Sequence, residues 1–230
     1  MNIIWLGHGS FRIEIGDQAL LIDPWINGNP MLPEDQVPAA IDGATHILVT
    51  HGHFDHTADS VTISQKTGAP VSAIFELGNL LFAKGAIQGH AYGRGGTIQL
   101  GNVTATLVPA SHSSSIGEDE NPRYSGQECG FMIRGEGKTI YHSGDTDIMA
   151  DMQWMGDYYK PDIGILSAGG YYTMDMAAAA YAARHFFHFG TVIPCHYRTF
   201  PTLEQSADVL RDGLPGVKVI EPEVMVPIPL

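Results

Sequence analysis

Three histidines and one aspartate stand within six positions in the stretch THGHFDHT. In an extended chain alternate side chains point to the same face, so His51 and His53 can reach one metal ion together. After Phe54 the chain turns into the start of a helix, where Asp55 and His56 are adjacent and can point to a second position nearby. Imidazole and carboxylate ligands at this density suit zinc, manganese or iron better than calcium, which prefers oxygen ligands throughout. The alternative is a cluster of solvated turn histidines, but chance produces this pattern in only about one such chain in a thousand.

Four residues cannot complete two metal shells, so further ligands must come from elsewhere in the chain. Three candidates stand where an apolar run gives way to polar residues: His112 after VTATLVPAS, Asp145 after TIYHSG and His196 after TVIPC. Taken alone, each has another interpretation, as a loop histidine, a helix N-cap aspartate or a half-buried histidine at a strand end. Together with the histidine cluster, they are the residues that we expect to complete the site.

Three further residues are weaker candidates for contacts with a substrate. His8, in GHGS, could reach the site from a neighbouring strand end, or it could be a buried histidine that hydrogen-bonds to the backbone. Ser113 lies in a polar loop beside a predicted ligand, where substrate contacts usually occur. Arg198, two residues after His196, could pair with a phosphate or carboxylate of the substrate, or form a surface salt bridge. Residues 113–128 could form a lid over the site or an ordinary exposed loop.

The elements that would position these residues follow from hydrophobic patterning. Short apolar or alternating runs broken by glycine and proline predict strands, and amphipathic runs closed by glycine predict helices. The predicted strands span residues 2–8, 11–15, 19–23, 46–50, 70–75, 97–100, 103–110, 130–134, 138–144, 162–168 and 191–195. The predicted helices span residues 58–67, 76–84, 148–156, 176–189 and 203–212. Thr202 and Gln205 form a predicted capping box for the last of these helices.

The order of these elements predicts two similar halves. Strand-rich blocks at residues 2–50 and 97–145 are each followed by alternating helices and strands. This order is typical of an α/β fold, a four-layer αββα sandwich with two mixed sheets face to face and helices outside. A length of 230 residues with 44% hydrophobic residues suits one domain, residues 1–230, around one sizeable core.

Composition excludes several classes of partner. The chain has 25 acidic and 12 basic residues, a net charge of −13, which argues against binding to nucleic acid or to a membrane surface. Cys129 and Cys195 have no CxxC spacing, so a disulfide framework is not expected, and a reducing cytoplasm fits best. The first residues lack a basic signal-peptide region, and no apolar run approaches the ~18 residues of a spanning helix. We therefore expect a cytoplasmic protein that acts on a small molecule; a homo-oligomer is compatible with the sequence, which leaves the oligomeric state open.

In their order and separation, the seven candidate ligands resemble those of the metallo-β-lactamase superfamily, over essentially the whole chain. The stretches LGHGSF, LLIDPW, YHSGDT and PCHYRTF resemble its ascorbate-6-phosphate-lactonase-like branch, and within it a group of short metal-dependent hydrolases of unassigned substrate. The resemblance implies two divalent metal ions, with zinc as the first choice and manganese or iron as alternatives. The implied ligands are His51, His53 and His112 for one ion, Asp55, His56 and His196 for the other, and Asp145 as a bridge between them.

The same resemblance implies hydrolysis of an ester-like bond, in a lactone or a phosphodiester. Two metal ions would lower the pKa of a bridging water from about 15.7 toward neutrality, and the resulting hydroxide would be the nucleophile, anchored or oriented by Asp55 and Asp145. The alternative is a metal- or ligand-binding sensor that retains the site without turnover. Metal-based redox chemistry is disfavoured, because the diiron relatives have glutamate at the position of His53 and carry an added flavin domain. The fold does not choose among substrates.

Overall fold

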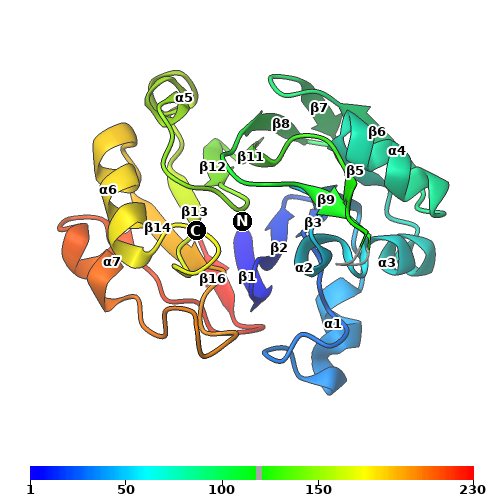
Figure 1. Ribbon diagram of the computed structural model, residues 1–230, viewed down its shortest axis with the longest axis horizontal. Coiled ribbons are helices and arrows are strands. Elements are labelled where there is room, and N and C mark those ends of the chain that lie inside the picture. Colours follow the sequence, from blue (N-terminus) through cyan, green and yellow to red (C-terminus); the bar gives the residue numbers. More distant parts are fainter. Residues whose placement is uncertain (118–120) are drawn as a thin grey trace.

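The structure is a computed structural model that describes residues 1–117 and 121–230. Within these residues the chain forms two seven-stranded sheets and one two-stranded sheet (Figure 1). In spatial order, the first large sheet contains β16 (Pro227–Pro229), β1 (Asn2–Gly7), β2 (Ser10–Ile15), β3 (Gln18–Ile22), β4 (His46–Val49), β5 (Val71–Ile74) and β6 (Gln88–Tyr92). The second contains β15 (Lys218–Val219), β14 (Thr191–Cys195), β13 (Ile163–Ser167), β12 (Lys138–His142), β11 (Cys129–Gly135), β8 (Val103–Pro109) and β7 (Thr97–Leu100). The small sheet pairs β9 (Ser115–Ile116) with β10 (Arg123–Tyr124).

Both large sheets are mixed in the same way. In the first, β1, β2 and β3 are antiparallel neighbours, and β3 to β6 run parallel. In the second, β7, β8, β11 and β12 are antiparallel neighbours, and β12 to β15 run parallel. The predicted α/β fold with two similar halves is confirmed.

Helices cover the outer faces of the two sheets (Figure 1). Those beside the first sheet are η1 (Glu34–Gln36), α1 (Val37–Ile41), α2 (Phe54–Thr57), α3 (Ser60–Thr67) and α4 (Phe75–Ala83). Those beside the second are α5 (Asp151–Tyr159), α6 (Met176–Phe186) and α7 (Asp208–Gly213). The predicted four-layer order of helix, sheet, sheet and helix is therefore present.

The core lies between the sheets and under the helices. All five residues of β13 and all five of β14 are buried, as expected for parallel strands that are covered on both faces. One hydrophobic cluster contains side chains from both sheets, among them Trp5 and Phe11 from the first sheet and Phe131 from the second. The sequence patterns that predicted these strands are therefore patterns of burial.

The strand directions bring the candidate ligands to one edge of each sheet. In the first sheet, β1 and β4 run in the same direction, and His8 and His51 follow their carboxyl ends. In the second sheet, β8, β12 and β14 share a direction, and His112, Asp145 and His196 follow their carboxyl ends. The candidate ligands, although far apart in the chain, can thus come together at the strand ends without long loops.

The predicted helix over residues 203–212 is wrong in its first half. The structure starts α7 at Asp208, and the capping box is absent because the Gln205 side chain donates to the carbonyl oxygens of Phe200 and Leu203. Tertiary contacts hold this segment away from helical geometry, since the Glu204 N–H donates to the Gly169 carbonyl. Here long-range contacts prevail over a local capping signal.

Other boundaries differ by smaller amounts. The helix α6 ends at Phe186 rather than at residue 189, because Phe187 and Phe189 are buried in the core, where their rings stack with centroids 4.7 Å apart. The helix expected at 148–156 forms as α5, three residues later. Several short elements were not predicted: η1, α1, β6, β9, β10, β15 and β16.

Two further expectations concern a membrane-spanning helix and the suggested lid. Among the helices of the described residues, none is both long and apolar enough to cross a membrane. The middle of the suggested 113–128 lid, residues 118–120, lies outside the described residues, and the parts on either side form the small β9–β10 sheet.

Candidate metal centre

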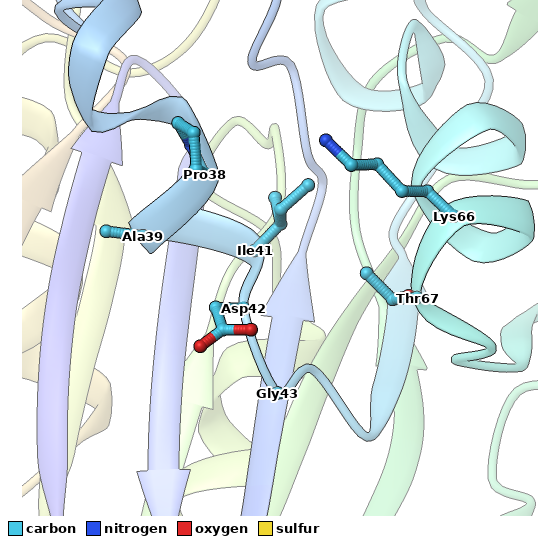
Figure 2. A pocket seen from close by; sticks show the side chains of 7 residues that line it. All are labelled: Pro38, Ala39, Ile41, Asp42, Gly43, Lys66 and Thr67. Carbon is cyan, nitrogen blue, oxygen red and sulfur yellow. The ribbon is translucent and has the colours of Figure 1, made fainter.

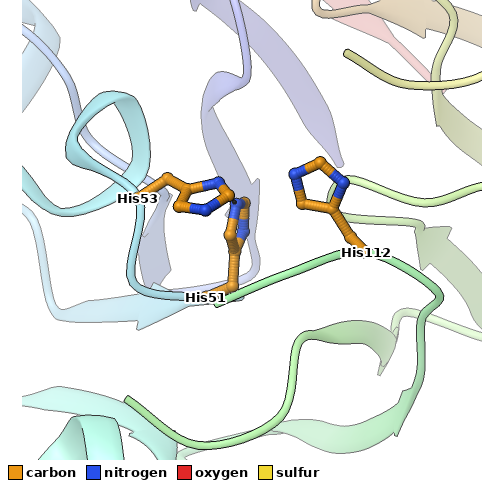
Figure 3. A group of neighbouring side chains, drawn as sticks. All are labelled: His51, His53 and His112. Atoms are coloured by element: carbon orange, nitrogen blue, oxygen red, sulfur yellow. Dashed lines mark hydrogen bonds between the residues drawn. The ribbon is translucent and has the colours of Figure 1, made fainter. Parts of the chain in front are cut away.

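Three histidine rings converge from two separate segments (Figure 3). His51 and His53 come from the turn between β4 and α2, and His112 comes from the loop after β8. One nitrogen from each ring lies within 4.8 Å of the other two, and His51 Nε2 is 2.9 Å from His53 Nδ1. We call these residues the three-histidine group. It has the spacing of a site that holds a divalent metal ion through imidazole nitrogens.

A second group of four donors lies beside the first and is almost wholly buried. It consists of Asp55, His56, Asp145 and His196, which we call the four-donor group. His56 Nε2 lies 3.3 Å from both Asp55 Oδ2 and Asp145 Oδ2, and His196 Nε2 lies 3.4 Å and 3.1 Å from the same two oxygens. Four ligands at tetrahedral positions about 2.0–2.1 Å from a zinc ion would be about 3.3 Å apart. Four of the six separations among these donors are thus close to those of a tetrahedral shell.

The Asp145 carboxylate lies between the two groups. Its Oδ2 atom belongs to the four-donor group, yet it is also 3.7 Å from His112 Nε2 and 4.0 Å from His51 Nε2. One oxygen is therefore close to donors of both groups. This is the position that a bridging carboxylate must take.

Burial and charge act differently on the two groups. In the three-histidine group, burial lowers the pKa of His51, His53 and His112, which keeps these rings neutral. In the four-donor group, burial also opposes the charged imidazolium, but Asp145 and Asp55 outweigh it and raise the pKa of His196 to about 9.

The carboxylates respond in the complementary sense. Burial favours the neutral acid at Asp145, but His196 and His56 outweigh it and hold the pKa of this carboxyl well below its ordinary value. The same carboxylates raise the pKa of His56 against the effect of burial. Without a metal ion, the four-donor group is therefore a buried network of opposite charges.

The donor set fits a divalent metal ion. His56 Nε2 is buried and has no hydrogen-bond partner among the described residues, although it faces two carboxylates. Buried polar atoms are normally satisfied, so an unsatisfied nitrogen aimed at a cluster of donors indicates a missing partner. Imidazole and carboxylate ligands in a tetrahedral arrangement suit zinc, and manganese or iron can use the same ligands.

Hydrogen bonds from outside the two groups orient two rings of the three-histidine group. His51 Nδ1 lies 3.0 Å from Thr50 Oγ1, and His53 Nε2 lies 3.3 Å from Ser113 Oγ. Such partners fix the tautomer and angle of a metal-binding histidine. Ser113, predicted as a weak substrate contact, is placed here as a partner of His53.

Asp23 is a functional candidate that the sequence reasoning missed. Its Oδ2 atom lies 2.8 Å from His56 Nδ1, and the same carboxylate accepts hydrogen bonds from the backbone N–H and the hydroxyl of Thr50. Asp23 is fully buried at the carboxyl end of β3. The signal was present in LLIDPW, where an acidic residue follows an apolar strand just as Asp145 does.

His8 and Arg198 have different surroundings. The ring of His8 is buried, with Nε2 2.9 Å from Asp55 Oδ2, and burial lowers its pKa to about 4 despite this hydrogen bond. The Arg198 guanidinium carbon lies 5.8 Å from the centre of the Tyr197 ring. The structure thus places His8 at the four-donor group and Arg198 over an aromatic ring.

A separate pocket lies away from both groups, between α1 and the end of α3 (Figure 2). Its volume is about 470 Å³. The residues that line it are Pro38, Ala39, Ile41, Asp42, Gly43, Lys66 and Thr67. None of the candidate ligands is among them, so its chemistry is unrelated to that of the two groups.

Comparison with known proteins supports a family. A family described as a Beta-lactamase superfamily domain matches residues 18–221. A UPF0173 metal-dependent hydrolase from Paracoccus denitrificans is 60% identical over 230 residues, which is all of both chains. A second, from Roseobacter denitrificans, is 62% identical over 228 residues, 99% of each chain.

A solved structure gives the same result. Igni18, a metallo hydrolase from the archaeon Ignicoccus hospitalis, superposes with a TM-score of 0.83 at 33% sequence identity, covering 100% of this chain and 98% of that one. The matching family, the similar relatives and the shared fold agree with each other. This chain therefore belongs to the metallo-β-lactamase superfamily.

Proposed function

We propose that this protein is a dinuclear metal-dependent hydrolase that cleaves an ester-like bond in a small molecule. The observation that carries the proposal is the pair of adjacent donor groups that share the Asp145 carboxylate. Its full-length relatives bear the name metal-dependent hydrolase, which supports the same class of reaction. Zinc is the first choice for both positions, with manganese or iron as alternatives.

Each group has a role in this proposal. Two bound divalent ions would supply Lewis-acid polarisation of the substrate oxygen and a lowered pKa for water. His51, His53 and His112 would hold one ion, and Asp55, His56 and His196 the other. Asp145 would hold both, and Asp55 and Asp145 present carboxylate oxygens that can orient the attacking water or accept its proton.

A covalent cysteine mechanism has no support in the structure. Both cysteines are buried. Burial raises the pKa of Cys129 to about 11 and also raises that of Cys195, so both remain neutral thiols at physiological pH. A thiol nucleophile needs an accessible thiolate. Neither cysteine is therefore suited to act as the nucleophile, a role that this proposal gives to water.

Aromatic side chains flank the four-donor group and indicate the substrate class. Trp25 packs against Phe54 and Phe200 with ring centroids 5.5 and 6.2 Å apart, and Tyr172 lies 6.3 Å from the ring of His196. Phe54, next to Asp55 in the chain, is 61% exposed, and Tyr172, beside the buried His196, is 54% exposed. Exposed aromatic rings beside a polar centre suit an apolar group on the substrate. A lactone or ester with an aliphatic or aromatic substituent therefore fits better than a phosphodiester without one.

A substrate panel tests the proposal. Protein loaded with zinc or manganese is incubated with lactones and esters of increasing apolar substituent and with generic phosphodiesters. Turnover should appear with the lactones or esters and rise with the apolar substituent. Turnover of phosphodiesters alone would overturn the substrate class, and silence across all panels with two metal ions bound would favour a sensor over an enzyme.

Variants test the residues. His51→Ala and Asp145→Ala should each lower turnover by at least about a hundredfold, because loss of a ligand costs more than loss of its hydrogen-bond partner. The exposed His185→Ala and Asp157→Ala are matched controls and should keep wild-type turnover. Thermal unfolding in chelator checks that each variant folds; wild-type turnover in either ligand variant would contradict the assignment.

A further inference from the structure

His8 contacts two members of the four-donor group in two different ways. Through its side chain, Nε2 lies 2.9 Å from Asp55 Oδ2. Through its backbone, the carbonyl oxygen accepts a hydrogen bond of 3.0 Å from the His196 N–H. His8, in the turn after β1, thus contacts Asp55 and His196, which lie 47 and 188 positions further along the chain.

The His8 side chain is itself held from behind. Its Nδ1 atom lies 2.7 Å from the Thr199 hydroxyl oxygen, closer than the two other acceptors near that hydroxyl, Tyr197 O at 3.3 Å and Met31 Sδ at 3.2 Å. A hydroxyl that donates to Nδ1 leaves the ring proton on Nε2. The ring then donates from Nε2 to Asp55, and its tautomer is set by Thr199.

The His8 backbone is fixed as well. The residue has a left-handed conformation with φ +53°, which few residues other than glycine adopt, and it is 1% exposed. The carbonyl oxygen accepts a second hydrogen bond, 2.8 Å, from the indole N–H of Trp5. The next residue continues the contact, since a Cβ on Gly9 would come within 3.0 Å of His56 Cε1.

These contacts concern one group only. Asp55, His56 and His196 all belong to the four-donor group. Within the part of the chain that the structure describes, no hydrogen bond joins His8 to the three-histidine group. The effect of His8 should therefore be selective between the two metal positions.

We propose that His8 is a positioning residue for the four-donor group: its Nε2–H orients Asp55, its carbonyl oxygen orients His196, and Thr199 sets its tautomer. This inference rests on the metal centre of the proposed function. It does not depend on the reaction, because its test measures zinc binding without substrate. Loss of His8 should weaken zinc at one position and leave the other unchanged.

The test uses two backgrounds, each with one group disabled. His53→Ala removes a ligand from the three-histidine group, and His56→Ala removes one from the four-donor group. Zinc affinity is measured by competition with a chelating dye. In the His53→Ala background, adding His8→Ala should raise the zinc Kd about 10–100-fold, the usual cost of losing a partner of a ligand. In the His56→Ala background, the same change should alter the Kd by less than about twofold.

Conservative variants separate orientation from general damage. His8→Gln places an amide donor near the position of the imidazole Nε2 and should restore most of the affinity, whereas Thr199→Val should weaken zinc a few-fold in the His53→Ala background alone. Both stand as tests if His8→Ala fails to fold, which circular dichroism would reveal. Equal weakening of zinc binding in both backgrounds, or no weakening by Thr199→Val in the His53→Ala background, would overturn the proposal. A protein that binds zinc as described but hydrolyses nothing would refute the proposed function alone.

Discussion

At the scale of single residues, the neighbours of a histidine decide its chemistry. His51 and His56 are both fully buried, yet the pKa of His51 is lowered and that of His56 is raised. The difference comes from the carboxylates of Asp55, Asp145 and Asp23, which outweigh the effect of burial at His56. Residue type alone could not have predicted these opposite directions.

His142 provides a test of burial without metal ligation. Its ring is buried, with Phe11 edge-on at 5.6 Å, and Nδ1 accepts a hydrogen bond from the Gly144 N–H. Burial lowers its pKa from 6.5 to about 4. The folded state therefore binds the proton less readily than the unfolded state does, and stability present above pH 6.5 is lost as the pH falls toward 4.

This asymmetry predicts a measurable acid sensitivity. Between pH 7.5 and pH 5, His142 should lower the free energy of unfolding of the metal-free protein by about 2 kcal/mol. His142→Asn keeps an acceptor near the Nδ1 position but does not titrate. Between pH 7.5 and pH 5 the free energy of unfolding of this variant should therefore fall by about 2 kcal/mol less than that of the wild type. Urea unfolding at both pH values measures the difference, with the exposed His185→Asn as a control that should follow the wild type. An equally steep fall in His142→Asn would contradict the prediction.

At the scale of elements, the loop between β8 and β11 positions His112. The Ser114 hydroxyl accepts a hydrogen bond from the Gly52 N–H and lies 2.8 Å from the Ser125 hydroxyl. Gly52 stands between His51 and His53, so the loop packs directly against the three-histidine group. A Cβ at Gly52 would come within 2.1 Å of Ser125 Oγ and 2.8 Å of the Ser115 carbonyl oxygen.

The absence of a side chain at Gly52 is therefore needed for this packing. Gly52→Ala should cost about 1–3 kcal/mol of stability, the usual effect of overpacking, and should also weaken zinc at the three-histidine group. Thermal unfolding and zinc competition in the His56→Ala background measure the two effects. Gly93→Ala is the matched control, since a Cβ there meets nothing within 4 Å, and it should change stability by less than about 0.5 kcal/mol. Unaltered stability in Gly52→Ala would contradict the packing argument.

At the scale of the whole molecule, the candidate metal centre contains residues from both halves. His51, His53, Asp55 and His56 follow β4 of the first sheet, whereas His112, Asp145 and His196 follow strands of the second. Both donor groups contain residues from both halves. A metal ion bound to either group would thus add a link between the sheets.

Metal removal should therefore lower stability strongly. At free zinc a thousandfold above Kd, one site adds about 4 kcal/mol to the folded state. In a chain of this size that amount corresponds to a rise in Tm of roughly 10 °C. Chelator should lower the Tm by at least this much and added zinc should restore it, as scanning calorimetry can measure.

The control is a chain with both groups disabled. The double variant His51→Ala, His56→Ala should show the same Tm with zinc and with chelator. A wild-type Tm that does not respond to either would argue against metal ions joining the halves.

The sequence by itself determined the features that depend on neighbouring residues, namely the strands and the spacing of the first four candidate ligands. Strand periodicity predicted most strands and the mixed α/β sandwich, because alternation and apolar runs report burial directly. The spacing of His51, His53, Asp55 and His56 predicted two metal positions, since side-chain direction along a strand end and a helix start depends on neighbouring residues alone. The resemblance to the metallo-β-lactamase superfamily implied the division of all seven ligands, and the structure brings those residues into two adjacent groups.

Only the tertiary structure decided what depends on long-range contacts. Thr199 lies 191 positions from the His8 ring that it faces, and the carbonyl of Gly169 holds Glu204 away from the helix that local signals favoured. The role of Asp23 depends likewise on the order of β3 and β4 in the sheet. The physical reason is that hydrophobic periodicity specifies which face of an element is buried. Which distant atoms meet there is set by the order and direction in which the strands pack.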